Sequence, residues 1–290
     1  MKKTLPLLSL ALVLVLFACK KSSKTEAQPE EKLYPVTFSA SEFQQSTKGM
    51  QSTLATDSAK KVLKKIIYAV FNSNGTLLRT IAQDVNTSPN FGTIVDSLPA
   101  GNYTATFMAS TGDLSYNILS TLSNTNVYND NNDLFANKAT FTVSGPLVNQ
   151  NIVLNRIVGK LTIVLKDIIP ANVSQLVVEY LDGSHYYPSR EENYNLEQKT
   201  YYYNITSLDR ASANYTITNF VLPNLTSTNI HIRAYTSTNT LVVDRTINNV
   251  ALSRNKETIV TGALFNDFNH PGGFTIFVSP SWGESSTINF

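Results

Sequence analysis

The chain has 290 residues, a formal net charge of +2 and a hydrophobic fraction of 42%. Only 15% of the residues are charged, against roughly 25% in an average soluble protein, and Asn, Ser and Thr take up the difference. This composition excludes a coiled coil, which is rich in Ala, Glu, Lys and Leu, and a chain that is disordered throughout. A single Cys and three His argue against a disulfide framework or a Cys/His metal site, and the length suggests about two domains.

The first residues have the pattern of a secretory signal peptide. A short basic segment precedes an apolar run at residues 5–18, which is shorter than the stretch of about 20 residues that spans a membrane. The run ends in Ala18-Cys19, which resembles the bacterial lipobox. The resemblance implies cleavage between these two residues and diacylglycerylation of the Cys19 thiol. Phe17 is bulkier than the residue usual at its place, so a plain signal peptide with an incidental Cys is the alternative.

Residues 19–32 follow the predicted cleavage site. Apart from Cys19 this segment is polar and of mixed charge, which predicts a disordered tether. Acyl chains on Cys19 would hold the protein to outer-membrane lipid without spanning it, and Lys20 agrees with outer-membrane sorting by resemblance to lipoproteins of Gram-negative bacteria. Loss of residues 1–18 removes two Lys and leaves 21 basic and 21 acidic residues. Binding to nucleic acid therefore has no electrostatic support.

From residue 33 onward the sequence has the pattern of short strands separated by turns. A first strand is predicted at 33–43, where residues 36–40 alternate between apolar and polar side chains, as a half-buried strand does. The apolar run at 66–71 predicts a central strand, and Asn74-Gly75 after it predicts a hairpin, because both positions tolerate a positive φ. Further strands are predicted at 91–98, 103–108, 138–143 and 151–154. The polar stretch 111–137 is predicted to be a long loop, with a helical turn as an option at 116–122.

The second half of the sequence repeats this style. Strands are predicted at 157–165, 176–180, 200–205, 215–222, 229–235, 240–247, 257–264 and 274–278. Two sets of about seven short strands, punctuated by Asn, Gly and Pro, predict an all-β fold of two tandem β-sandwiches. We expect the first sandwich at residues 33–155 and the second at residues 156–290.

Two tyrosine clusters are candidates for contact with a partner. They are Tyr186 with Tyr187, and Tyr201 with Tyr202 and Tyr203. Neighbouring side chains of a strand point to opposite faces, so at least Tyr202 or its neighbours should be exposed. Exposed aromatic side chains often contact proteins or glycans. The alternative is that these tyrosines cover the edge of a sandwich.

Other candidates for chemistry are weak. Asp130 and Asp133 offer oxygen ligands for Ca²⁺, but the segment lacks the Gly and the distal Glu of an EF-hand loop, so a solvated loop tip is expected. His185, His231 and His270 lack the spacing of metal ligands. The sequence contains neither a G-x-S-x-G nucleophile motif nor a Gly-rich phosphate loop. We therefore expect no enzymatic activity, no cofactor and no metal.

Several of these features occur together in a known family. The apolar strand ending in Phe71, the turns at 72–75 and 98–101, and the apolar strand at 157–161 that follows Arg156 resemble the fimbrillin-type lipoproteins of Bacteroidetes, and most of all their minor fimbrial anchor subunits. The resemblance implies two tandem transthyretin-like sandwiches with Greek-key topology. It also implies assembly with fimbrial subunits by β-strand addition, in which a strand of one subunit completes a sheet of the next.

The resemblance further distinguishes anchor from shaft subunits. Polymerising members lose an N-terminal strand, often through cleavage after an Arg, whereas anchor subunits keep that strand and stay bound to lipid. This chain has no Arg between Cys19 and Arg79, which favours an anchor that keeps the strand at 33–43. The sequence thus predicts a structural, lipid-anchored fimbrial protein of the cell surface. The alternative is a surface lipoprotein that binds glycans or nutrients, suggested by the tyrosine clusters and the low charge.

Overall fold

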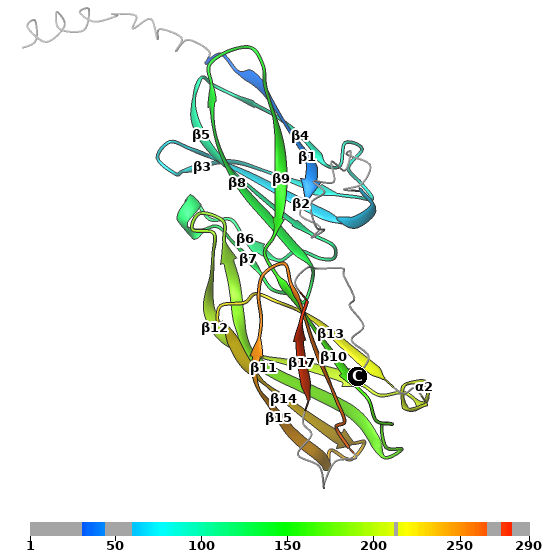
Figure 1. Cartoon of the computed structure of the whole chain (residues 1–290). Coiled ribbons are helices and arrows are strands. Elements are labelled where there is room, and N and C mark those ends of the chain that lie inside the picture. The colour runs from blue at the N-terminus through cyan, green and yellow to red at the C-terminus, as the bar shows by residue number, and fades with distance from the viewer. Residues whose placement is uncertain (1–30, 44–59, 212–213, 266–273, 280–290) are drawn as a thin grey trace, which may run out of the picture. The chain divides into compact units, whose positions relative to one another are not determined.

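The structure is a computed structural model that describes residues 31–43, 60–211, 214–265 and 274–279. The chain divides into two compact units, Met1–Lys32 and Leu33–Phe290. The predicted signal peptide, Cys19, the tether up to residue 30, and His270 lie outside the described residues. Almost all of the described part of the second unit belongs to strands or the turns between them, which confirms the predicted all-β fold (Figure 1). Within the described ranges, no helix has the length and apolar character needed to cross a membrane.

A seven-stranded sheet forms the first part of the second unit, in the order β3-β2-β5-β8-β9-β1-β4. The pairing of β8 with β9 is confined to Phe135 opposite Arg156 and Ala136 opposite Asn155, so the sheet folds there into two layers. Buried side chains from both layers form one hydrophobic cluster, which is the core of a sandwich. The strands are β1 (Tyr34–Phe43), β2 (Lys65–Asn72), β3 (Leu77–Asp84), β4 (Thr93–Leu98), β5 (Gly101–Ser110), β8 (Leu134–Val143) and β9 (Val148–Arg156).

The β2–β3 hairpin follows directly from the sequence. Strand β2 is buried at every residue from 66 to 71, as expected of an apolar strand covered on both faces. The turn after it is closed by the side chain of Asn72, whose Oδ1 accepts hydrogen bonds from the backbone N–H of Asn74 and of Thr76, both at 3.0 Å. Gly75 has a φ of 76°, a conformation that most side chains disfavour.

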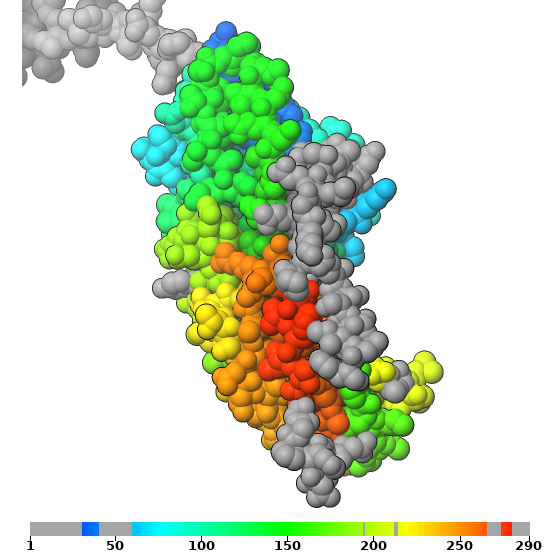
Figure 2. Space-filling model, in the orientation of Figure 1, coloured from blue at the N-terminus to red at the C-terminus, as the bar shows by residue number. Residues whose placement is uncertain are grey.

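The second part of the unit is also a sandwich, made of two sheets around a second hydrophobic cluster. One sheet has the order β13-β10-β16-β17, and its edge strand β17 is seen in red in Figure 2. The other has the order β15-β14-β11-β7-β6, with β12 paired to β11. The strands are β10 (Gly159–Leu165), β11 (Val173–Tyr187), β12 (Glu192–Asn204), β13 (Tyr215–Val221), β14 (Ser227–Thr236), β15 (Leu241–Ala251), β16 (Glu257–Gly262) and β17 (Thr275–Val278), and a short helix, α2 (Ser207–Arg210), follows β12.

Residues 116–128 cross from the first half of the sequence into a sheet of the second half. They form β6 (Tyr116–Asn117), a 3-10 turn (Leu122–Asn124) and β7 (Asn126–Tyr128) in place of the long loop predicted there. Strand β7 pairs with β11, with Val127 opposite Tyr186. The polar, Asn-rich composition of this segment concealed the strands, because they are only two and three residues long.

A third hydrophobic cluster joins the two halves. Ile67 and Met108 from the first sheet pack there with Val127, Tyr186 and Leu222. Because the strands at 116–128 and this cluster connect residues on both sides of the boundary expected between 155 and 156, that boundary stays a prediction. The first and second clusters nevertheless draw their residues from 36–154 and 161–265 respectively, so each half has a core of its own.

Candidate functional site

Strand β1 is the first strand of the described residues and follows the predicted tether, and it lies in the middle of a layer. It pairs in antiparallel fashion with β4, with Thr37 opposite Val95, and in parallel fashion with β9, with Thr37 opposite Asn149. A strand that has neighbours on both sides fills a groove between them. Without β1, the facing edges of β4 and β9 would expose unpaired backbone groups.

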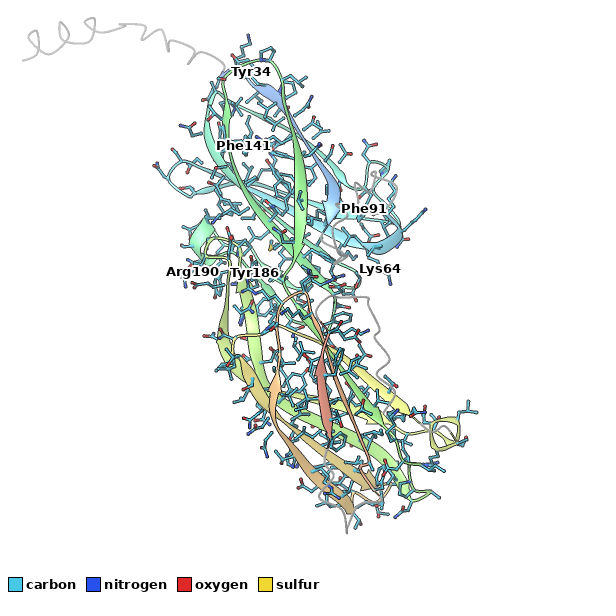
Figure 3. All side chains as sticks on the ribbon, viewed as in Figure 1. Tyr34, Lys64, Phe91, Phe141, Tyr186 and Arg190 are labelled. Atoms are coloured by element: carbon cyan, nitrogen blue, oxygen red, sulfur yellow. The ribbon has the colours of Figure 1, made fainter. Side chains whose placement is uncertain are left out.

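The inward side chains of β1 complete the core of the first sandwich. Val36, Phe38 and Ala40 are buried, whereas Thr37 and Ser39 are half-buried, which confirms the alternation predicted for this strand. The ring of Phe38 lies 5.2 Å from that of Phe107 and 5.1 Å from that of Phe141, centroid to centroid, in edge-on contact. Tyr34, at the start of the strand, and Phe141 are labelled in Figure 3.

Strand β4 forms one wall of the groove. Charged and polar side chains of β2 and β3 hold this strand in place. Asp96 of β4 is buried, and its carboxylate forms an ion pair with Arg79 of β3. It also accepts hydrogen bonds from the Tyr68 hydroxyl at 3.1 Å and from the Ser97 backbone N–H at 2.7 Å. Burial, together with the Asp96 charge, raises the pKa of the Tyr68 hydroxyl, which keeps it protonated as the donor. Strand β4 therefore has support that does not depend on β1.

Gln83 of β3 provides a second link to the same wall. Its side-chain Nε2 donates to the carbonyl of Thr93 at 2.8 Å, and its Oε1 accepts from the backbone N–H of Gly92 at 2.9 Å. With Arg79, these bonds join β3 and β4, the two edge strands of the seven-stranded sheet. The groove that β1 fills thus belongs to a sandwich whose two edge strands are linked to each other by side chains.

These supporting residues were missed in the sequence, although one signal was present. Strand β4 alternates with Ile94 and Leu98 buried, and Asp96 takes the inward position between them. A carboxylate at an inward position is almost never buried without a partner, so the alternation alone called for a basic partner on a nearby strand.

The five predicted contact tyrosines have different environments. Tyr186 is buried in the cluster that joins the two halves, and Tyr187, Tyr201 and Tyr203 are half-buried. Burial raises the pKa of Tyr186, Tyr201 and Tyr203 to about 12 in each case. Only Tyr202 of this set has a mostly exposed side chain, at 67%. Of the five tyrosines, Tyr202 is therefore the candidate that stays for the predicted surface contact.

The Asp- and Asn-rich segment at 129–133 is a connection between the two halves and not a solvated loop tip. The Asn129 Nδ2 donates to Asp182 Oδ2 and to the Phe220 carbonyl, both at 3.0 Å, and Asn131 Oδ1 accepts from the Phe220 N–H at 2.7 Å. Burial raises the pKa of Asp182 to about 6. The second predicted Ca²⁺ ligand, Asp133, is also buried and pairs with a guanidinium.

That guanidinium belongs to Arg156 at the end of β9. Its Nε and Nη2 donate to the two oxygens of Asp133 at 2.8 and 3.0 Å, and its Nη1 donates to Asn255 Oδ1 at 2.9 Å. The guanidinium also lies over the Phe135 ring, 4.9 Å from its centroid. Burial raises the pKa of Asp133, while the charge of Arg156 opposes this shift. The Asp133 oxygens, one of the two carboxylates predicted to suit Ca²⁺, are thus already engaged.

The two histidines among the described residues, His185 and His231, have separate environments. The His185 ring lies against that of Tyr128 in a tilted contact, with ring centroids 4.3 Å apart, and its Nδ1 contacts the Ser184 hydroxyl at 2.5 Å. His231 lies on β14 and pairs with Asp244 of β15 and with Glu179 of β11. Among residues 31–43, 60–211, 214–265 and 274–279, no group of three or more His, Cys, Asp or Glu side chains is placed to hold a metal ion.

Sequence comparison places the chain in a family. Residues 32–288 match the Family of unknown function (DUF6562). The chain belongs to this family. No curated protein sequence matches it.

Three solved structures with a fold similar to that of this DUF6562 member come from Bacteroides and Porphyromonas species. A candidate polysaccharide-binding protein (DUF1812) from Bacteroides thetaiotaomicron has 14% identity and a TM-score of 0.54, covering 79% of this chain and 92% of its own. A candidate adhesin from Bacteroides ovatus has 14% identity and a TM-score of 0.53, covering 87% and 95%. The fimbrial anchor protein Mfa2 from Porphyromonas gingivalis has 11% identity and a TM-score of 0.52, covering 87% and 98%. The predicted resemblance to fimbrial anchor proteins is thus confirmed at the level of fold.

Proposed function

We propose that this DUF6562 protein is a fimbrial subunit of the cell surface, and specifically the anchor that joins a fibre to the outer membrane through an acylated Cys19. The observation that carries this proposal is the position of β1. It follows the predicted tether, and it fills the groove between β4 and β9 with its own residues. A subunit whose groove is filled from within cannot accept a donor strand there, so it would end a fibre rather than extend it.

The strength of the β1 contacts supports this role. Burying side chains such as Val36 and Phe38 contributes about 1.5–3 kcal/mol each, to which the backbone bonds on two sides of the strand are added. The absence of Arg between Cys19 and Arg79 means that a protease specific for Arg has no site from which to release this strand.

The comparison adds support of a coarser kind. The fimbrial anchor protein Mfa2, a candidate adhesin and a candidate polysaccharide-binding protein share this fold over most of their lengths. A fimbrial or adhesive role at the cell surface agrees with all three, and a structural, non-enzymatic role agrees with the absence of a catalytic motif in the sequence.

An anchor needs another surface to receive its fibre. Strand β12 has 13 residues and, in the part of the chain that the structure describes, pairs with β11 alone. A long strand with one free edge is suited to strand addition, because main-chain groups supply the hydrogen bonds and alternate side chains supply the specificity. We propose the free edge of β12 as the place where a fimbrial subunit adds a strand.

A disulfide lock on β1 tests the anchor role. The double variant Thr37→Cys/Val95→Cys joins two residues that face each other on β1 and β4, where antiparallel partners have the Cα separation that a disulfide accepts. If β1 stays in place in the working protein, cells with the locked variant should carry as many fibres as wild-type cells, counted by electron microscopy. The single variant Thr37→Cys serves as the control.

A shaft role would give a different result. Locked β1 would then prevent the opening of the groove, fibres would be lost in the double variant, and a reducing agent would restore them. That outcome would overturn the anchor proposal while leaving a fimbrial role intact. Unchanged membrane attachment with no dependence of any fibre on this gene product would overturn both.

A further inference from the structure

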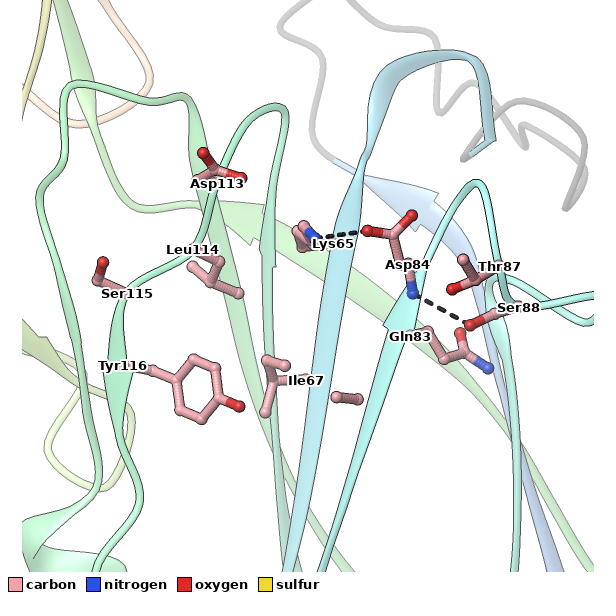
Figure 4. A pocket seen from close by; sticks show the side chains of 11 residues that line it. Lys65, Ile67, Gln83, Asp84, Thr87, Ser88, Asp113, Leu114, Ser115 and Tyr116 are labelled. Atoms are coloured by element: carbon pink, nitrogen blue, oxygen red, sulfur yellow. Dashed lines mark hydrogen bonds and ion pairs between the residues drawn. The ribbon is translucent and has the colours of Figure 1, made fainter.

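A pocket of about 320 Å³ lies on the outer face of the β2–β3 hairpin. Its floor is apolar and comes from Ile67 of β2 and Ala82 of β3, which face each other in the hairpin. The segment 113–116, which enters β6, forms one wall. Figure 4 shows Leu114 and Tyr116 on this side, Thr87 and Ser88 on the opposite side, and Lys65 between them. The volume is at the small end of the range for ligand sites, which is about 300–1,000 Å³.

Some polar groups of the pocket are hydrogen-bonded within the protein, and others are available to a ligand. Lys65 Nζ donates to Asp84 Oδ2 at 2.5 Å, and Asp84 Oδ1 accepts from the Asn86 N–H at 2.8 Å, so this pair forms a fixed polar side. Among the described residues, the side chains of Thr87, Ser115 and Tyr116 form no hydrogen bonds. They line the pocket with hydroxyl groups that are free both to donate and to accept.

We propose that this pocket binds a single uncharged pyranose residue of a saccharide. A sugar ring has apolar C–H faces and a rim of hydroxyl groups. Tyr116, which is 39% exposed, offers an aromatic face on which the C–H face of the sugar can pack. Thr87 and Ser115 offer hydrogen-bond partners for the sugar hydroxyl groups. The apolar floor of Ile67 and Ala82 completes the match to an amphipathic ring.

The charges of the site favour a neutral ligand over an acidic one. The charge of Lys65 is compensated by Asp84. Asp113 is exposed at the mouth of the pocket and adds a second carboxylate. Among the described residues, the cation that acts on it is Lys65, whose charge is already compensated by Asp84. A uronic or sialic acid would therefore meet net negative charge, whereas a neutral sugar would use the Asp113 oxygens as acceptors.

This inference goes beyond the proposed fimbrial role. Gln83 lines the pocket and also links β3 to β4, but the side chains that would contact the sugar, those of Tyr116, Thr87, Ser115 and Asp113, take no part in the β1 groove. The inference also moves a glycan contact away from the tyrosine clusters predicted in the sequence to a different tyrosine. For a single sugar residue in a small open pocket, we expect a dissociation constant on the order of 1 mM.

Saturation-transfer difference NMR on the full-length protein in detergent tests the proposal. The probes are the methyl glycosides of glucose, galactose, mannose and N-acetylglucosamine, each at about 5 mM so that a millimolar site is well occupied, with glucuronic acid as the acidic comparison. At least one neutral glycoside should show transfer, and glucuronic acid should show less. Tyr116→Ala should weaken binding about tenfold, and Asp113→Ala about fivefold.

The control variant is Tyr202→Ala, which removes an exposed tyrosine of the other sandwich and should leave binding unchanged. Tyr116, Asp113 and Tyr202 are all exposed, so circular dichroism spectra and melting temperatures of the three variants should equal those of the wild type. The proposal is overturned if no neutral glycoside shows transfer, if glucuronic acid binds best, or if Tyr202→Ala abolishes binding while Tyr116→Ala does not.

Discussion

At the scale of single residues, the buried carboxylate of Asp182 has the clearest effect on pH dependence. It accepts hydrogen bonds from Asn129 and from the Leu222 N–H, yet its other oxygen is buried without a partner among the described residues. Burial disfavours the charged form and raises the pKa to about 6 from 3.8. The folded protein therefore binds this proton more tightly than the unfolded chain does.

The sign of the stability change follows from this shift. The contribution of Asp182 is fully present below pH 3.8 and is lost as the pH rises through about 6. Between pH 4 and pH 7, this one group should lower the free energy of unfolding by about 2 kcal/mol. In Asp182→Asn that component of the pH dependence should disappear, as measured by urea unfolding at both pH values. Equal pH dependence in the two proteins would refute the assignment.

Phe38 is the residue of β1 on which the sandwich core most depends. Phe38→Ala should lower the free energy of unfolding by about 3–5 kcal/mol, because the ring is fully buried between Phe107 and Phe141 and its loss leaves a cavity. Thr37→Ala, on the half-buried side of the same strand, should change it by about 0.5 kcal/mol or less. Urea titration of both variants makes the comparison. A similar loss in both would mean that β1 does not insert as a half-buried strand.

At the scale of elements, the end of β9 and the segment 129–133 act together through one ion pair. Arg156→Met should destabilise the protein by about 3–5 kcal/mol, because Asp133 would stay buried without its cation. The matched control is Lys199→Met, which breaks an ion pair with the half-exposed Glu197 and should cost about 1 kcal/mol at most. Adding Asp133→Leu to Arg156→Met should recover part of the loss. No recovery would show that the ion pair is not the cause.

The strands predicted from local pattern agree with the structure where one strand is followed by its neighbour. The run at 66–71 lies within β2, the alternation at 103–108 lies within β5, and the hairpin after β2 turns at Gly75 as expected. These features depend on periodicity and turn chemistry, which the sequence carries locally.

Pairing between distant segments could not be read in the same way. The parallel pairing of β1 with β9 joins Val36 to Val148, and the pairing of β7 with β11 joins Val127 to Tyr186. Two short polar strands such as β6 and β7 have no periodic signal. Of the candidate site, the alternating face of β1 was predictable, whereas the support of β4 by Arg79 and Gln83 and the pocket at Tyr116 arise only when separate strands meet.

At the scale of the whole molecule, the predicted lipid anchor is the property that most needs a direct measurement. Cys19→Ser should abolish labelling with palmitate and release the protein from the outer-membrane fraction, since no other Cys is present to carry the acyl chains. Labelled palmitate followed by membrane fractionation gives both readings. Wild-type protein that stays in the membrane without label would contradict the lipoprotein prediction.

Residues 116–128 include β7, which pairs with β11, a strand that comes later in the chain, and this pairing sets an order of events during synthesis. The residues of the first hydrophobic cluster end at Leu154, so that core has all of its side chains once this point of the chain is available. Val127, however, pairs with Tyr186, which follows Leu154 in the chain and is made roughly 2 to 6 seconds after it at the usual rate of about 5–20 residues per second. Until then Val127 and Met108 lack the partner that covers them. The interval leaves an apolar surface open on a nearly finished domain, and a chaperone that holds the nascent chain would act there.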